Sequence, residues 1–291
     1  MSRRPGFKFL RPTEATEAVA ALAEHADDVK VIAGGQSLGP MLSYHLIAPA
    51  VLVDLNGVAA LRGISIGVHD IVIGATTTQA TIAASVALRD ACPLLVDATA
   101  WIAHPSVRER GTIGGSLAHN DPAGEYPSVL LALGAQARLL SPRGERMLDV
   151  ASLVEQRILD TTIGVDEIIT EIVIPTLAPR TGHAFRELAE RRGDYAIAGA
   201  AVSLTLGADG ATVESASVCA VGGLYPVRLR AAEAVLARRR PSRELLLEAA
   251  AAAADEAPMG DDIHATAAYR RRLFSSLAAH CLEQAYASAR A

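Results

Sequence analysis

The order of apolar and polar positions predicts a small α/β unit over the first sixty residues. After Pro12, the segment EATEAVAALAEHA has apolar residues at helical spacing and acids in its first turn, which predicts a helix capped by Thr13. The apolar runs VKVIAG and AVLVDLNG predict two short buried strands, the second closed by Asn56 and Gly57. Between these strands, PMLSYHLIAP predicts a helical turn.

From Val58 the pattern changes. GISIGVHDIVIGA predicts two strands around a turn at His69–Asp70, and the segment from TTTQ to AWI predicts a helix in two pieces, broken at Pro93. A long loop rich in glycine and proline follows, and then a helix from about Tyr126 and a strand. DEIITEIVIP predicts the final strand of this unit.

The segment TLAPRTG is the best candidate for a linker between domains. Beyond it, two strands joined by a turn at Asp209–Gly210 precede alanine-rich helices. We therefore expect an α+β protein with two α/β subdomains, residues 1–57 and 58–178, and a C-terminal domain of antiparallel sheet and helices, residues 179–291.

Composition limits the function. The chain has 291 residues, of which 51% are hydrophobic and 20% charged, so a sizeable core is expected. The net charge of −5 argues against a nucleic-acid partner held through phosphate contacts. No uncharged stretch approaches the roughly 18 residues that a membrane helix needs, and no apolar region follows the basic start. We expect a cytoplasmic protein with no transmembrane segment.

The three cysteines, Cys92, Cys219 and Cys281, are far apart and form no C-x-x-C pair. They predict buried thiols rather than disulfides or an iron–sulfur cluster held by this chain. His119 and Asp121 have no third metal-ligand candidate beside them, so no metal site is expected.

The stretch VIAGGQSLGPM allows two functional interpretations. Gly35 to Gly39 fits G-x-S-x-G, the turn that presents a nucleophilic serine in α/β-hydrolases. The same residues follow an apolar strand directly, as in a backbone cradle for phosphate. The hydrolase interpretation is the weaker, because only one clear strand and no glycine-rich loop precede Ser37 to supply the oxyanion hole.

A second loop, Gly111-Thr-Ile-Gly-Gly-Ser116, supports the cradle. Glycine lets backbone N–H groups approach an anion closely, and two such loops can hold one pyrophosphate from two sides. The chain has neither the phosphate loop G-x-x-x-x-G-K-[ST] nor the G-x-G-x-x-G of the Rossmann fold, which leaves this other geometry.

Three segments, AGGQSL, TIGGSLAHNDPAGEYP and RRGDYAIAGAAV, carry a resemblance to a known family. In order and spacing the chain resembles the FAD-binding medium subunit of molybdenum hydroxylases, which include carbon monoxide dehydrogenase and xanthine dehydrogenase. The resemblance covers essentially the whole chain and implies a PCMH-type FAD-binding fold.

The resemblance implies a set of FAD contacts in this sequence. The first loop would wrap the pyrophosphate, the second would form an opposite wall, and single residues would complete the site. These residues are Val31, Ile32, Ala33, Gly34, Gly35, Gln36, Ser37 and Leu38; Thr112, Ile113, Gly114, Gly115 and Ser116; and Ile102, Glu125, Ile169 and Tyr195.

Several of these positions depart from the family pattern or carry a special role in it. Ser116 stands where many relatives have Asn, and Glu125 where the family usually has an Asp that bonds toward the nucleotide half of FAD. Tyr195 would lie near the isoalloxazine ring and gate its face. Several relatives have a Lys where this chain has Glu187. Either Glu187 faces solvent here, or the flavin potential is tuned differently.

The resemblance also implies partners. This chain would carry FAD in a heterotrimer, assembled as (αβγ)2, with a large molybdopterin subunit and a small iron–sulfur subunit. FAD would take electrons from the [2Fe-2S] clusters of the small subunit and pass them to an external acceptor, without a catalytic side chain on this chain. The alternative is a self-sufficient FAD-dependent reductase of the UDP-sugar reductase type, which would need its own substrate pocket and proton donor.

Overall fold

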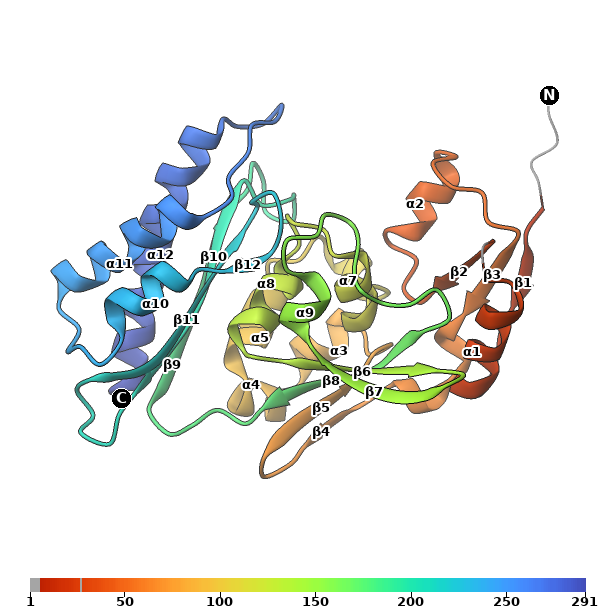
Figure 1. Ribbon diagram of the computed structural model, residues 1–291, viewed down its shortest axis with the longest axis horizontal. Coiled ribbons are helices and arrows are strands. Elements are labelled where there is room, and N and C mark those ends of the chain that lie inside the picture. Colours follow the sequence, from red (N-terminus) through yellow and green to blue (C-terminus); the bar gives the residue numbers. More distant parts are fainter. Residues whose placement is uncertain (1–5, 27) are drawn as a thin grey trace.

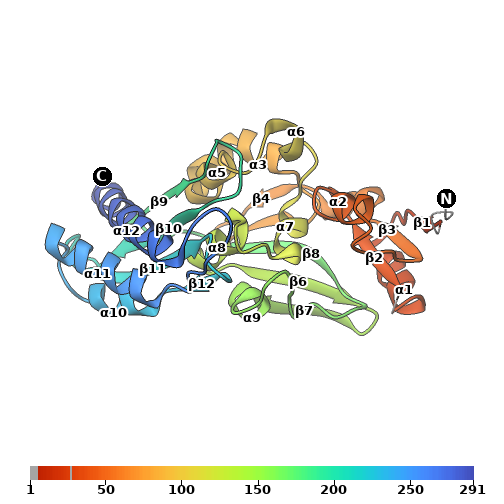
Figure 2. The same cartoon turned by 90° about the horizontal axis from the view of Figure 1, so that it is seen from above.

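The computed structural model describes residues 6–26 and 28–291. It has three parts arranged in a row, with the N-terminal part at one end and the C-terminal part at the other (Figures 1 and 2). Each part contains its own sheet and its own main group of buried apolar side chains. The α+β class and the overall arrangement predicted from the sequence are confirmed.

The N-terminal part is a three-stranded parallel sheet in the order β1-β3-β2. Helix α1 begins at Ala15, two residues after the predicted cap, because the Glu17 carboxylate accepts the N–H groups of Thr13 (2.9 Å) and Glu14 (3.3 Å). The elements are β1 (Lys8–Leu10), α1 (Ala15–Glu24), β2 (Val29–Ile32), α2 (Leu38–Ser43), β3 (Val51–Asp54) and two 3-10 turns, Leu55–Gly57 and Ala59–Leu61.

The middle part is a five-stranded antiparallel sheet in the order β4-β5-β8-β6-β7, with helices packed on it. Its strands are β4 (Ile64–Ile66), β5 (Asp70–Gly74), β6 (Gln136–Ser141), β7 (Gly144–Asp149) and β8 (Ile168–Pro175). Its helices are α3 (Gln79–Ala84), α4 (Val86–Ala91), α5 (Pro93–Thr99), α6 (Pro105–Arg108), α7 (Ile113–His119), α8 (Glu125–Ala132) and α9 (Val150–Val154).

The helices of the middle part differ from the prediction in three places, of which one is α9, a helix that the sequence did not indicate. The segment predicted as two helical pieces is three, because Ser85 starts α4 by accepting the Leu88 N–H with its hydroxyl (3.2 Å). The predicted long loop contains two short helices, α6 and α7. Pro105 occupies the first turn of α6, and Thr112 caps α7, so both helices have local start signals.

The C-terminal part is a four-stranded antiparallel sheet, β12-β11-β10-β9, with helices α10 to α12 on its outer face (Figure 1). Its inner face contributes Phe185, Ala201 and Val221 to the core of the middle part. Strands β9 and β12 were not predicted from the sequence, and neither were β1 and β7. The elements are β9 (Thr181–Leu188), β10 (Ala198–Leu206), β11 (Val213–Val221), β12 (Val227–Arg228), α10 (Arg230–Leu236), α11 (Arg243–Glu256) and α12 (Ala267–Ala289).

The cysteines are as predicted: Cys92, Cys219 and Cys281 are free thiols buried in the protein. Within the described ranges, none of the helices combines the length and the apolarity that a membrane crossing requires.

Candidate functional site

A cleft of about 1290 Å³ runs between the three parts, and residues from all of them line it. Ordinary ligand pockets span roughly 300–1,000 Å³, so this cleft has room for a long ligand. Nearly all the residues that the sequence assigned to FAD lie on its walls: Val31, Ile32, Ala33, Gly34, Gly35, Gln36, Ser37, Leu38, Ile102, Thr112, Gly114, Gly115, Ser116, Glu125, Ile169 and Tyr195.

Ile113 is the exception. Its side chain is fully buried in the core of the middle part and does not line the cleft. The reason is helical geometry: Ile113 is the first residue of α7 and points inward, whereas Gly114 and Gly115 turn their backbone toward the cleft. The side chain of Ile113 therefore supports the wall from behind.

The first glycine loop joins β2 to α2 and presents its amides without internal partners. The N–H groups of Gly34, Gly35, Gln36 and Ser37 donate to no acceptor among the described residues. The carbonyl groups of this loop are held instead, because the Gln36 amide donates to the Gly34 oxygen (2.9 Å). The loop is thus arranged to bind an anion.

Asn56 provides a second anchor for the first loop. Its side-chain nitrogen donates to the carbonyl oxygen of Ala33 (2.7 Å) and to the carboxylate of Asp54 (2.6 Å). Asp54 and Asn56 lie at and just after the end of β3, the strand that pairs with β2. The sheet therefore fixes the carbonyl side of the loop and leaves its N–H side free.

The second glycine loop has a different structure. The N–H groups of Ile113 and Gly114 donate to the carbonyl oxygens of Thr77 (3.2 Å) and Ala75 (2.9 Å). Thr112 accepts the N–H of Gly115 with its hydroxyl (3.2 Å) and the N–H of Ser116 with its carbonyl (3.0 Å). These four amides are already paired, so this loop forms a wall of the cleft and not a second set of free donors.

Two glycines keep the two loops in contact. A Cβ on Gly34 would overlap the carbonyl oxygen of Arg110 and lie 2.9 Å from the Cα of Gly111. A Cβ on Gly114 would lie 2.6 Å from the Cβ of Ala75. Glycine is therefore required here by close approach within the protein, whereas the sequence suggested that it makes room for the anion.

Ser37 lacks the geometry of a hydrolase nucleophile. Its backbone is in the right-handed helical region (φ −101°, ψ −50°), and it precedes the short helix α2 (Leu38–Ser43). The nucleophile elbow of α/β-hydrolases instead holds its serine in a strained turn. Strand β2 is also at the edge of a sheet of only three strands.

Acidic side chains gather where the cleft meets the C-terminal part. Asp121, Glu125 and Tyr195 line this end, and Glu187 lies behind Glu125 with only 5% of its surface exposed. The structure thus decides the orientation of Glu187, which faces inward. Tyr195 is 69% exposed at this end.

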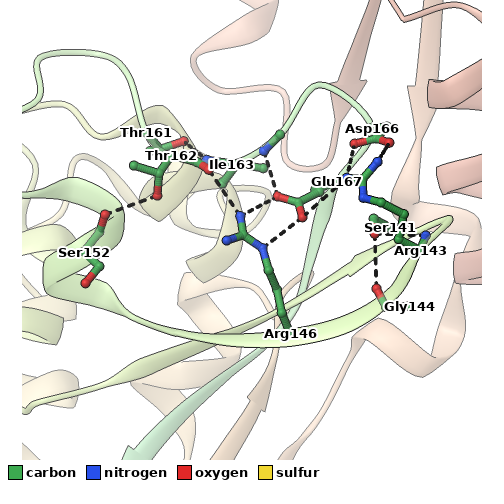
Figure 3. A network of polar contacts seen from close by, with 11 residues as sticks. Ser141, Arg143, Gly144, Arg146, Ser152, Thr161, Thr162, Ile163, Asp166 and Glu167 are labelled. Atoms are coloured by element: carbon green, nitrogen blue, oxygen red, sulfur yellow. Dashed lines mark hydrogen bonds and ion pairs between the residues drawn. The ribbon is translucent and has the colours of Figure 1, made fainter.

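Apart from Ile169, the sequence did not indicate a third wall, the segment 159–169, which an ion-pair network holds in place (Figure 3). The buried Glu167 accepts hydrogen bonds from Nε (2.9 Å) and Nη2 (2.7 Å) of Arg146 and from the N–H of Gly164 (2.8 Å). Although burial acts to raise it, these bonds leave the pKa of Glu167 below its ordinary value.

Arg270 was also missed, because its contacts are distant in sequence. It is 5% exposed and donates to the carbonyl oxygens of Ile197 and Gly222 and to the carboxylate of Asp262. The hydrogen bond from Arg270 holds the pKa of Asp262 at about 2. Three loops that line the C-terminal end of the cleft are therefore tied together by one side chain.

Two family models together match most of the chain. Residues 5–177 match the family described as the FAD binding domain in molybdopterin dehydrogenase, and residues 183–285 match the CO dehydrogenase flavoprotein C-terminal domain.

Within the described residues, no group of three or more His, Cys, Asp or Glu side chains is placed to hold a metal.

Similar proteins are subunits of dehydrogenase complexes. The 6-hydroxypseudooxynicotine dehydrogenase complex subunit alpha of Paenarthrobacter nicotinovorans is 37% identical, with 98% of this chain and 96% of that protein covered. The carbon monoxide dehydrogenase medium chain of Hydrogenophaga pseudoflava is 33% identical, with 97% and 98% covered.

Solved structures agree. A carbon monoxide dehydrogenase from Hydrogenophaga pseudoflava superposes with a TM-score of 0.94 at 33% identity, with 99% of each chain covered. Quinoline 2-oxidoreductase from Pseudomonas putida 86 gives a TM-score of 0.92 at 29% identity, with 100% of each chain covered.

Proposed function

Because this chain belongs to the family of FAD-binding subunits of molybdopterin dehydrogenases, we propose that it is the electron-transfer flavoprotein of a three-subunit molybdenum hydroxylase. In this proposal a small subunit with [2Fe-2S] clusters delivers electrons to FAD on this chain, and FAD passes them to an external acceptor. The substrate is oxidised on a large molybdopterin subunit, and the complex is a cytoplasmic (αβγ)2 assembly.

The observation that carries the proposal is the row of free amides from Gly34 to Ser37. A diphosphate brings negative charge and several acceptor oxygens, which these N–H groups would satisfy. The second loop, Thr112 to Ser116, would close the opposite side with its wall and the Ser116 hydroxyl. Bound FAD supplies the redox chemistry, and the protein supplies its position and electrostatic environment.

The remaining predicted contacts are proposed for the rest of the cofactor. Ile102 and Ile169 would pack against it from the middle part, and both are largely buried at the cleft. The resemblance assigned Glu125 to the nucleotide half of FAD and Tyr195 to the isoalloxazine ring, but both line the cleft and Glu125 acts electrostatically on the Tyr195 hydroxyl, so we propose instead that both act near the flavin half. Tyr195 would cover the flavin face.

We keep the proposed domain boundaries at 1–57, 58–178 and 179–291. The end of β8 at Pro175 and the start of β9 at Thr181 support the second boundary. The first boundary comes after β3 and its 3-10 turn. The cofactor would then bind between domains, where ligand clefts are common.

The test is to purify the chain with its native partners through a tag on this chain. We expect a yellow complex with one FAD per copy of this chain and two further subunits, one with iron–sulfur clusters. A colourless preparation that takes up no FAD would refute the proposal. A yellow chain that turns over a substrate without other subunits would favour the self-sufficient reductase instead.

A further inference from the structure

Two buried carboxyl groups, one from the middle part and one from the C-terminal part, lie close enough to interact electrostatically at the cleft wall. Glu125 is the first residue of α8 and lines the cleft, and Glu187 is on β9. Their exposed fractions are 8% and 5%. Both carboxylate oxygens of Glu187 are without a hydrogen-bond partner among the described residues. An ionised carboxylate in such a place is costly.

Among the described residues, the cation nearest to this pair offsets only part of its charge. Arg108 is the cation that acts on Glu125, but it already donates to the carbonyl oxygens of Ile102 (2.6 Å) and Ala103 (2.7 Å). Asp121 adds a further negative charge, and its carboxylate accepts the N–H of Ala123 (2.9 Å). On the β9 side, His183 lies four residues before Glu187 and 4.0 Å from Asp97.

The consequence for protonation is clear. Burial, and then the neighbouring Glu187, raise the pKa of Glu125 to about 8. Burial raises the pKa of Glu187 to about 7. Two close carboxylates in a poorly solvated site do not both ionise near neutral pH, and their protons leave in steps that belong to the pair.

We propose that Glu125 and Glu187 keep at least one proton between them at neutral pH, and that this proton is required for tight binding of FAD in the cleft. The proposal rests on the proposed FAD-binding function. With the proton, Glu125 presents a hydrogen-bond donor in the cleft wall. Without it, the pair carries two negative charges beside a site that must accept an anionic dinucleotide.

The first experiment measures the dissociation constant of FAD at pH 6 to 9 by flavin fluorescence, with the full chain stripped of its cofactor. For the wild-type chain we expect binding to weaken by about tenfold across this range, the size of effect that one unit charge has at short range. Glu187→Gln removes one ionisable group, so we expect a shallower pH dependence and tighter binding than wild type at pH 9.

The matched control is Glu214→Gln, the same change on β11 of the same domain, where the side chain is exposed. It removes one negative charge without touching the pair. We expect Glu214→Gln to follow the wild-type pH dependence. A pH dependence that is identical in wild type and Glu187→Gln would overturn the proposal.

A second experiment needs no FAD. A carboxyl whose pKa is raised on folding stabilises the folded state fully below its unfolded pKa, about 4.5, and this stabilisation is lost as pH rises through the folded value. The wild-type Tm is therefore expected to fall between pH 5 and 8 relative to Glu125→Gln/Glu187→Gln, with Glu214→Gln matching wild type. Equal slopes of Tm against pH in wild type and the double variant would contradict a proton shared by Glu125 and Glu187.

Infrared spectroscopy of the wild-type chain gives a direct readout that needs no variant to fold. A protonated carboxyl C=O band at pH 7 that disappears by pH 10 is expected, and its absence would overturn the proposal. Glu187→Asp retains the pair and should keep this band. If FAD binds at no pH while the band and the Tm slope are present, the proposed function fails and the shared proton stands.

Discussion

The two glycine loops have similar sequences, GGQS and GGS, but they present opposite backbone surfaces to the cleft. In the first loop the carbonyl oxygens of Ala33 and Gly34 are held by Asn56 and Gln36, and the N–H groups are free among the described residues. In the second loop the N–H groups are consumed by Thr112 and by the carbonyls of Ala75 and Thr77. The first loop can bind an anion through its free N–H groups, and the second loop forms a supporting wall of the cleft.

The difference arises from how each loop leads into the helix that follows it. The first loop leaves a parallel strand and has no capping side chain, since Ser37 makes no cap hydrogen bond. The second loop starts with Thr112, whose hydroxyl caps α7 at once. The similar sequences therefore indicate a glycine-rich turn in both places, but they do not indicate which backbone groups remain free for a ligand.

Gly114→Val is expected to have the largest effect on stability. The new side chain would overlap Ala75, whose Cβ and carbonyl oxygen are 2.6 and 2.8 Å from a Cβ at this position. Overpacking of this kind costs about 3 kcal/mol. Denaturant unfolding of the chain without FAD measures it, and a loss confined to FAD binding would show that the second loop acts as a direct ligand.

Gly39→Ala is the control for Gly114→Val. Gly39 lies in α2 just after the first loop, and a Cβ there meets nothing within 4 Å. We expect an unchanged stability or a gain of about 0.5–1 kcal/mol, because alanine is the better helix residue. A large loss at Gly39 would mean that α2 is packed more tightly than its contacts indicate.

Gly34→Ala tests the contact between the loops. The added methyl group would push the first loop away from the backbone of Arg110 and Gly111. We expect strain of about 1–3 kcal/mol. If the strain acted only on the FAD-bound state, about 1.4 kcal/mol of it would weaken FAD binding tenfold. Fluorescence titration with FAD, beside an unfolding curve, divides the effect between binding and stability. Unchanged FAD affinity would show that the first loop is not part of the FAD site.

The local parts of this site were predictable from the sequence, and the long-range parts were not. The two loops are indicated by glycine, hydroxyl and apolar residues at short spacing, and both line one cleft. The network of Arg146 with Glu167 joins β7 to a distant segment without a motif. The burial of Glu187 depends on how the unpredicted strand β9 packs against the middle part.

Two of the missed strands, β1 and β9, have a similar cause. Strand β1 has three residues and owes its existence to parallel pairing with β3, whose residues lie about forty positions away. Strand β9 exposes Arg186 and Leu188 while burying Phe185 and Glu187, so its polarity does not alternate as in a half-buried strand. Pairing partners, and not local propensity, decide both elements.

Thr112→Ala should lower stability by about 1 kcal/mol, the usual cost of losing a helix cap. The Gly115 N–H would lose its acceptor, the Thr112 hydroxyl. The freed amide would then face the cleft, since Gly115 is among the residues that line it. Urea unfolding checks the loss. If Thr112→Ala left stability unchanged, the two loops would be more alike than their hydrogen bonds indicate.

Ser37→Ala is the matched change in the first loop, and its expected effect on stability is the smallest. Ser37 caps nothing with its side chain, so we expect the free energy of unfolding to change by less than about 0.5 kcal/mol. FAD affinity should fall by less than about tenfold, as for one hydrogen bond to a phosphate among several. The same variant tests the serine interpretation, because a hydrolase would lose all activity toward an ester when this hydroxyl is removed. Unchanged stability with slightly weaker FAD is the result that a backbone cradle requires, since its donors are the amides of Gly34 to Ser37 and alanine retains every one of them.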